Sequence, residues 1–484
     1  MKSEILKKCG KSLCIFFSAA FLLTACGRQE TSGLSEKNPT NITIWHYYNG
    51  SLGIAFDELA AEFNNTVGRE NGIIVHSESM STIAGLESAL WDAASQKVGA
   101  AKMPNIFQCY PDTALALDEV VPLVDFDDYL TEDEKVSYVK LFLDSGYIGQ
   151  NHSWKIFPVA KSTEVLILNK TDWDKFAADT GAAVEDLSTW EGLASTAEKY
   201  YSWSDGRAFF GRDAFANYLI TASSQLGHEI FQTTGSSVTI DFDKDTMRQI
   251  WDSFYVPYVK GYYKHVGNYR SDDVKVGEII ALVCSSSSAV FFPTEVTIAN
   301  SAPYPITYMV LPLPNFNRSA PYAIQQGGGM AATKSTEAEV QASIMFLKWF
   351  TQMEQNLRFS VNSGYMPVGV EAIKPENVDR YLLEHPTADI VRDTLSVSLD
   401  ENNRYVMYTS PAFIGGTQAR EILERTMPEL AASDRAAVEA GAPLNDFLTD
   451  EHFDEWYLDT LSKLKECCDR EVSENEKNVS VHQP

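Results

Sequence analysis

Alternating apolar and polar positions predict a strand at residues 41–46 (Asn-Ile-Thr-Ile-Trp-His), which ends in a turn at Tyr47-Tyr48-Asn49-Gly50. Apolar residues then recur at helical spacing, and the two patterns alternate until residue 121. Three strands are predicted at 41–46, 72–79 and 105–110, with helices at 56–63, 86–96 and 113–121. This order is typical of a parallel sheet whose strands are joined by helical crossovers.

The rest of the chain continues to mix the two patterns. Proline disfavours the helical conformation of the residue before it, so the helix that begins at Gln418 is expected to end before Pro428. Because 484 residues are too many for one ordinary hydrophobic core, we expect an α/β protein with two lobes. Further strands are predicted at 154–160, 164–169, 278–283, 308–314 and 325–332, and further helices at 211–231, 246–263, 337–359, 418–427 and 446–466.

Charge and cysteine usage exclude several classes of function. The formal net charge of −27 repels phosphate backbones, so we expect no nucleic-acid partner. The histidines are scattered, and the cysteines show neither metal-ligand spacing nor a dense disulfide pattern, so no metal and no cofactor is expected. Cys109 and Cys284 are expected to be buried thiols, with a disulfide between them as the alternative.

The first residues have the pattern of an export signal. Four lysines precede an apolar run of about 11 residues, against the ~20 that cross a bilayer, so residues 1–25 are predicted to be a signal peptide. Leu23-Thr-Ala-Cys26 resembles the lipobox of bacterial lipoproteins, which implies lipidation of Cys26 and an extracytoplasmic, membrane-anchored chain. A plain secretory signal with a chance cysteine is the alternative. Polar residues 26–39 are expected to form a flexible tether.

Four segments carry a resemblance to the family 1 extracellular solute-binding proteins of ABC importers. It covers about residues 41–466, and the segments occur in the family's order. They are Ile42-Thr-Ile-Trp-His-Tyr-Tyr-Asn-Gly-Ser-Leu-Gly, Trp154-Lys-Ile-Phe-Pro-Val-Ala-Lys-Ser-Thr-Glu-Val-Leu-Ile-Leu-Asn-Lys, Gly327-Gly-Gly-Met-Ala-Ala-Thr-Lys with the following Phe346-Leu-Lys-Trp-Phe helix, and Asn362-Ser-Gly-Tyr-Met-Pro-Val.

The resemblance implies a type II periplasmic-binding-protein fold, with two discontinuous lobes joined by hinge crossings. Lobe one is expected at 40–163 and 324–370, lobe two at 164–323 and 371–470, and a disordered tail at 471–484. It also implies that a monomer holds a solute between the lobes, closes on it and docks on ABC permease subunits.

The motifs are most similar to those of the glycerol-3-phosphate and glycerophosphodiester binders of that family. This chain departs from them at Ile83, where those proteins have a tyrosine, and at Phe413, where they have an arginine for phosphate. An apolar ring in place of that arginine favours a carbohydrate, in particular an oligosaccharide. A phosphate ester of glycerol remains the alternative ligand.

Aromatic rings and hydroxyl-binding polar groups are the side chains that sugars need. Tyr47 and Tyr48 follow the first strand, at the edge where open α/β sheets bind ligands; a packed turn is the alternative for each. Asp112 is expected to accept hydrogen bonds from ligand hydroxyl groups, to cap the next helix, or both. Glu164 begins an apolar strand, where an unpaired carboxylate is costly, so we expect it to bind ligand.

The other candidates have a structural alternative as well. The serines and threonine could donate to ligand or be strand-edge polar groups, and the glycines could approach ligand closely or act as a hinge. The aromatic candidates could stack on a sugar or pack in a core. These candidates are Ser162, Thr163, Trp203, Ser285, Ser286, Gly327, Gly328, Tyr365 and Phe413.

We expect no catalytic residues. The sequence contains no Gly-x-Ser-x-Gly elbow, His-Glu-x-x-His helix or phosphate loop. The alternatives from other classes are a secreted glycoside hydrolase, which needs two carboxylates facing one sugar, and a sensory surface lipoprotein that binds no small solute.

Overall fold

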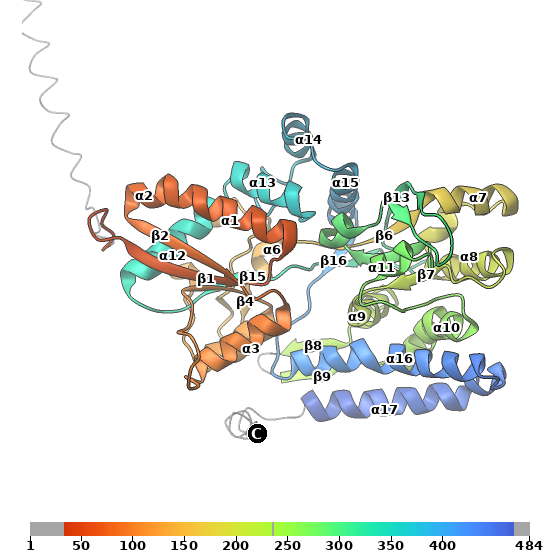
Figure 1. Ribbon diagram of the computed structural model, residues 1–484. Coiled ribbons are helices and arrows are strands. Elements are labelled where there is room, and N and C mark those ends of the chain that lie inside the picture. The colour runs from red at the N-terminus through yellow and green to blue at the C-terminus, as the bar shows by residue number, and fades with distance from the viewer. Residues whose placement is uncertain (1–32, 235–236, 469–484) are drawn as a thin grey trace, which may run out of the picture.

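The computed structural model describes residues 33–234 and 237–468. The predicted signal peptide, Cys26, the predicted tail at 471–484 and part of the predicted tether lie outside these ranges. Within them, no helix is both long enough and apolar enough to cross a bilayer. Two four-stranded sheets, each with its own helices, divide these residues into a first and a second lobe (Figure 1).

The first lobe is built on a sheet of β1 (Thr40–His46), β2 (Ile73–Ser79), β3 (Ile106–Cys109) and β15 (Gly329–Ala332), in the order β15-β3-β1-β2. β1 pairs in parallel with β2 and with β3, whereas β15 joins β3 in the antiparallel sense. The predicted parallel sheet with helical crossovers is therefore confirmed. Helices lie on both sides of it (Figure 1), as is usual for parallel strands.

Aromatic residues form the core of the first lobe. Rings of α1 (Gly50–Asn65) pack against rings of α12 (Glu337–Phe350) and α13 (Met353–Ser363). The prediction of one helix over 337–359 is wrong, because the chain leaves the helical path at Thr351 and Gln352 before α13 begins. The other crossover helices of this lobe are α2 (Val67–Asn71), α3 (Ile83–Ala94) and α4 (Pro111–Asp118).

The second lobe has a mixed sheet of β6 (Glu164–Asn169), β7 (Phe210–Arg212), β10 (Ala281–Ser285) and β13 (Tyr308–Pro312), in the order β13-β6-β10-β7. β6 is antiparallel to both of its neighbours, and all six of its residues are buried. A strand that is covered on both faces has a continuous run of apolar residues, and this run is why β6 could be predicted from the sequence.

Helices surround this second sheet. The predicted helix over 211–231 is wrong at both ends, because β7 precedes it and Phe231 begins another strand. The expected helix end before Pro428 is also wrong: α16 continues through this proline. A proline inside a helix removes one hydrogen bond at a cost of ~3 kcal/mol, and here packing on α9, α10 and α17 offsets that cost. The helices are α7 (Lys170–Thr180), α8 (Trp190–Trp203), α9 (Phe215–Gln225), α10 (Lys244–Lys260), α11 (Arg270–Lys275), α16 (Gly416–Glu439) and α17 (Asp450–Cys468).

The lobes meet along a boundary where the chain passes repeatedly from one to the other. β16 (Val406–Tyr408) lies there (Figure 1), and β14 (Tyr322–Ile324) pairs with it in parallel. α15 (Asp389–Arg404) packs on β6 and β13 of the second lobe and on α13 of the first.

α14 (Pro375–Glu384) lies beside α15 and contributes Val378 to the core of the first lobe. The 3-10 helix η3 (Ser286–Phe291) follows β10 at the boundary. The remaining short elements are η1 (Phe126–Asp128), α5 (Glu132–Lys135), α6 (Lys140–Asp144), β4 (Tyr147–Ile148), β5 (Ser153–Trp154), η2 (Val184–Ser188), β8 (Phe231–Thr234), β9 (Ser237–Ile240), β11 (Glu295–Val296), β12 (Tyr304–Pro305) and η4 (Leu444–Phe447).

Candidate functional site

Two tyrosines stand at the boundary where neighbouring parallel strands of the first lobe end. Tyr47 follows β1 and Tyr110 follows β3; both are half-buried, with nearly parallel rings whose centroids are 6.4 Å apart. Their hydroxyl oxygens lie 3.4 Å apart. Carboxyl ends of parallel strands meet at one edge of a sheet, which explains the pairing. Tyr47 was a sequence candidate, whereas Tyr110 was missed although it occupies the matching position after the third strand.

The glycine segment before β15 reaches the same place. The Gly328 N–H donates to the Tyr47 hydroxyl at 3.4 Å, and a Cβ at Gly328 would lie 2.9 Å from the Cys109 carbonyl oxygen. Gly327 has φ +92°, a value that favours glycine. The Lys161 ammonium donates to the Gly327 carbonyl at 3.3 Å and thereby orients this peptide.

Lys161 itself is buried, and sequence reasoning missed it. Burial lowers its pKa to about 8, and its Nζ also donates to the Ser145 hydroxyl at 3.1 Å. Lys161 therefore links the glycine segment to the end of α6.

Tyr365 and Tyr48 differ in what they contact. Tyr365 is buried beside Tyr47 and beside Ser287 of the second lobe, and burial raises its pKa well above the ordinary value, so the hydroxyl keeps its proton. Tyr48 is 1% exposed and packs edge-on against Phe359. Tyr365 therefore belongs to the boundary, whereas Tyr48 is mainly a core residue of the first lobe.

The four hydroxyl candidates join the two lobes to each other. The Ser285 hydroxyl donates to the Ser162 hydroxyl at 3.3 Å. The Ser286 N–H donates to the Thr163 carbonyl at 2.8 Å, and the Thr163 N–H donates to the Ser286 hydroxyl at 3.4 Å. Ser162, Thr163 and Ser286 are buried, and Ser285 is half-buried. In this conformation the Ser162, Ser285 and Ser286 hydroxyls are thus engaged within this group, and the Ser285 hydroxyl also bonds to that of Ser287 at 3.0 Å.

Glu164 is the fully buried centre of a polar network at the same boundary. Its carboxylate accepts from Arg212 Nη2 at 2.8 Å, from Asn217 Nδ2 at 3.0 Å and from Gln326 Nε2 at 3.2 Å. The Arg212 side chain is 1% exposed, so this is a buried ion pair with the desolvation cost that such pairs carry. The sequence expectation of a ligand carboxylate did not include this arginine, which lies 48 residues further along the chain.

Asp112 lies in the first turn of α4 but contacts the second lobe. A Cβ at Gly416 would lie 2.7 Å from its Oδ2, so the carboxyl group packs directly on the amino end of α16. Burial raises the pKa of Asp112 to about 7, although Arg420 and the Phe413 N–H oppose the shift.

The aromatic rings of Phe413 and Trp203 do not lie among the candidate residues at the boundary. Phe413 is buried in the core of the second lobe, where its ring centroid is 5.0 Å from that of Phe231. Trp203 lies at the end of α8, where it packs on Phe176 and its Nε1 donates to Asp179. Besides Lys161 and Arg212, the boundary has a third cation, Arg420, seven residues after Phe413. Arg420 Nη2 donates to Asn217 Oδ1 at 2.7 Å and Nη1 donates to the Ser410 hydroxyl at 3.3 Å.

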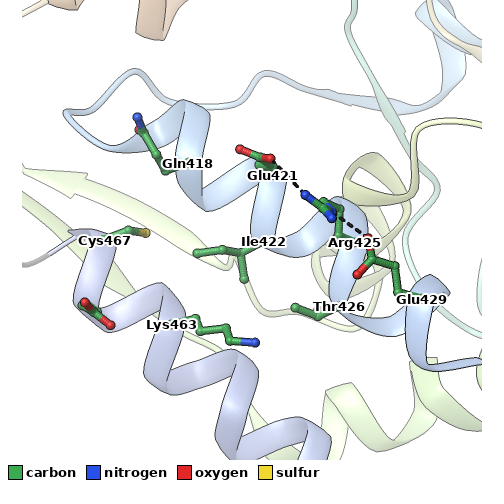
Figure 2. A pocket seen from close by; sticks show the side chains of 9 residues that line it. Gln418, Glu421, Ile422, Arg425, Thr426, Glu429, Lys463 and Cys467 are labelled. Atoms are coloured by element: carbon green, nitrogen blue, oxygen red, sulfur yellow. Dashed lines mark hydrogen bonds and ion pairs between the residues drawn. The ribbon is translucent and has the colours of Figure 1, made fainter. Parts of the chain in front are cut away.

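Two cavities of the second lobe lie away from the boundary. A groove of about 390 Å³ runs between α16 and α17, lined by charged side chains that largely pair with one another, such as Arg425 with Glu421 and Glu429 (Figure 2). A second cavity of about 420 Å³ is also lined by residues of the second lobe alone. Neither contains the tyrosines or the buried network. Among the described residues, no group of His, Cys, Asp and Glu side chains is arranged to hold a metal ion.

α15, which packs on both lobes, carries a buried carboxyl group with a raised pKa. Glu401 accepts from the Leu313 N–H at 2.6 Å, and burial raises its pKa from the ordinary 4.5 to about 8. The folded state therefore holds a proton that the unfolded state loses. The stability contributed by this group is present below pH 4.5 and is lost as the pH rises towards 8.

We expect the Glu401→Gln substitution to remove this loss. Glutamine keeps the acceptor for Leu313 but does not ionise, so the variant is expected to be more stable than the parent by about 1–3 kcal/mol at pH 8. Urea unfolding at pH 5 and pH 8 measures the difference, with the exposed Glu439→Gln as the control. Equal pH dependence in parent and Glu401→Gln would show that Glu401 ionises normally.

Comparison with known proteins gives a consistent picture. A family model described as bacterial extracellular solute-binding protein matches residues 58–383. A search of curated proteins finds no match.

Solved structures share the fold at low sequence identity. The cyclic alpha-maltosyl-1,6-maltose binding protein of Arthrobacter globiformis has a TM-score of 0.65 and 15% identity, over 89% of this chain and 100% of that one. UgpB of Mycobacterium tuberculosis, in complex with glycerophosphocholine, has 0.66 and 18%, over 90% and 99%. The GacH receptor of Streptomyces glaucescens, studied with acarbose, has 0.66 and 12%, over 90% and 100%. These structures share the two-lobed fold, and the family model spans more than half of the sequence. The chain belongs to the bacterial extracellular solute-binding protein family.

Proposed function

We propose that this protein captures a neutral oligosaccharide between its lobes and delivers it, chemically unchanged, to an ABC importer. The observation that carries the proposal is the character of the boundary. It gathers the hydroxyls of Tyr47, Tyr110 and Tyr365 with serine hydroxyls, while Glu164 is neutralised by Arg212. Aromatic faces with neutral donors and acceptors match a sugar better than a charged solute.

Polar atoms that lack a partner at the boundary support a hydroxyl-rich ligand. Among the described residues, Gln325 Oε1 and Thr409 Oγ1 are buried without a hydrogen bond, next to the β14–β16 pair. A buried polar atom left unpaired costs roughly 1–3 kcal/mol, and ligand hydroxyls entering this region would recover part of that cost. Neighbours of the same fold bind cyclic alpha-maltosyl-1,6-maltose, cycloalternan and acarbose.

The proposal includes the organisation of the chain. By this proposal lobe one comprises 40–163 and 324–370 and lobe two comprises 164–323 and 371–470, with α14 of this last range packed on the core of lobe one through Val378. The protein acts as a monomer, and lipid on Cys26 holds it at the outer face of the membrane, within reach of the permease subunits. The basic and apolar leader before Leu23-Thr-Ala-Cys26 supports this anchoring.

A phosphate ester of glycerol is the second candidate ligand, and Arg420 favours it. Within the described ranges this guanidinium has no ion pair with a carboxylate, and its contacts are the neutral groups of Asn217 and Ser410. Arginine suits phosphate oxygens well. UgpB of M. tuberculosis, with the same fold, binds glycerophosphocholine.

A thermal-shift screen separates these possibilities. The chain from Gly27 onwards, which retains every described residue, is tested against mono- and oligosaccharides, glycerol 3-phosphate, glycerophosphocholine and peptides. A ligand at 100 times its Kd stabilises the folded state by ~2.7 kcal/mol. A shift with an oligosaccharide that is recovered intact supports the proposal. A shift only with phosphate esters would identify the ligand as the second candidate. Cleavage of a glycoside would contradict the proposed function and indicate a hydrolase.

A further inference from the structure

Asp112 belongs to the first lobe but is packed into the second. Its two carboxyl oxygens would lie 2.7 and 2.8 Å from a Cβ at Gly416, so a side chain at this position would displace the carboxyl group from its present contact. α16 begins there with no side-chain cap and no acidic residue in its first turn. Figure 1 shows α16 extending from the boundary into the second lobe. The contact therefore exists only while the two lobes are together.

Several groups face Asp112, and they do not fully compensate its charge. Arg420 on α16 attracts it, and the Phe413 N–H donates to it. Glu87 on α3 repels it, and the Tyr408 phenol of β16 is the other titratable group nearby. Arg420 directs its hydrogen bonds to Asn217 and Ser410, and no ion pair joins it to Asp112 in the part of the chain that the structure describes. A carboxylate buried in this way is destabilised relative to the neutral acid.

We propose that Asp112 is a positioning residue that makes closure of the two lobes take up a proton, so that solute capture is proton-linked. The proposal rests on the proposed function, because it requires that the lobes separate and close.

The direction of the effect follows from the two environments of the carboxyl group. With the lobes apart, the group is hydrated and its pKa is expected near 3.9. With the lobes together, burial raises the pKa to about 7. Closure therefore binds a proton between these values. The ratio of closed to open protein falls as the pH rises through this window, by up to tenfold per unit, and levels off above pH 7.

The test needs no solute. Small-angle X-ray scattering of the chain from Gly27 onwards reports the ratio of compact to extended protein at pH 5 and pH 8. We expect this ratio to be at least about tenfold higher at pH 5 in the parent. Asp112→Asn keeps the size of the side chain but does not ionise, so we expect its ratio to change less than about twofold. The control Asp92→Asn removes an exposed carboxylate of the same lobe and should behave like the parent.

A second pair of variants tests the contact itself. Gly416→Ala places a methyl group against the carboxyl of Asp112, so it is expected to favour the extended form at both pH values. Adding Asp112→Ala removes that clash and should restore compaction. Circular dichroism confirms that each variant is folded.

The outcomes separate this proposal from the proposed function. The same pH response in the parent and Asp112→Asn, or no response in either, overturns proton linkage. That result would leave a carbohydrate found by the thermal-shift screen untouched. Conversely, a pH response that depends on Asp112 stands even if the screen finds no carbohydrate.

Discussion

Arg212→Met is expected to lower the free energy of unfolding by about 3–5 kcal/mol. The substitution leaves the Glu164 carboxylate fully buried with only the amides of Asn217 and Gln326 as partners. A buried charge that loses its counter-ion is far more costly than the loss of one hydrogen bond. Urea denaturation followed by circular dichroism measures the change.

Two further variants show whether the charge is the cause. The double variant Arg212→Met, Glu164→Gln removes both charges and should recover more than half of the lost stability. The control Arg248→Met removes a half-buried arginine whose partner Asp450 is 86% exposed, so it should cost less than about 1 kcal/mol. A loss of the same size in Arg212→Met and Arg248→Met would contradict a buried ion pair at the boundary.

Tyr110→Ala is expected to weaken oligosaccharide binding by about ten- to a hundredfold. It removes one of the two nearly parallel rings at the boundary and the hydroxyl beside Tyr47. Burying an aromatic ring of this size against a ligand contributes roughly 1.5–3 kcal/mol, which corresponds to that range of affinity. Isothermal titration calorimetry measures Kd for the carbohydrate that gives the largest shift in the thermal-shift screen.

The control for this prediction is Tyr269→Ala. Tyr269 is 65% exposed on the second lobe, and its removal should leave Kd unchanged. Tyr110→Ala with the affinity of the parent and an unchanged melting temperature would mean that the solute does not contact these rings.

The parts of the fold that local pattern determines could be predicted from the sequence. The strand at 41–46 and its parallel neighbours follow from hydrophobic periodicity, and Tyr47 follows from its place at the end of the first strand. By contrast, α15 was not recognised, because the buried polar residues Thr394, Ser398 and Glu401 interrupt its apolar face. Pro428 was taken as a helix end because its local penalty was visible and the packing that offsets it was not.

The contacts of the site depend on pairings between distant segments. Glu164 stood out as a carboxylate in an apolar strand, but nothing local indicates that Arg212 neutralises it. Phe413 was weighed against an arginine at its own position, whereas an arginine reaches the boundary seven residues later, at Arg420 in α16. The consecutive glycines Gly415 and Gly416, which begin a helix without a side-chain cap, were the one local signal for the contact with Asp112.

The central claim is that one solute molecule is held between the lobes and is not altered. Native mass spectrometry of the chain from Gly27 onwards, incubated with a mixture of neutral oligosaccharides and glycerol phosphate esters, tests it directly. We predict a single adduct of one carbohydrate per chain, whose released ligand keeps its original mass, and much weaker adduct formation in Tyr110→Ala. No adduct with any member of the mixture, or release of shortened glycans, would contradict the account.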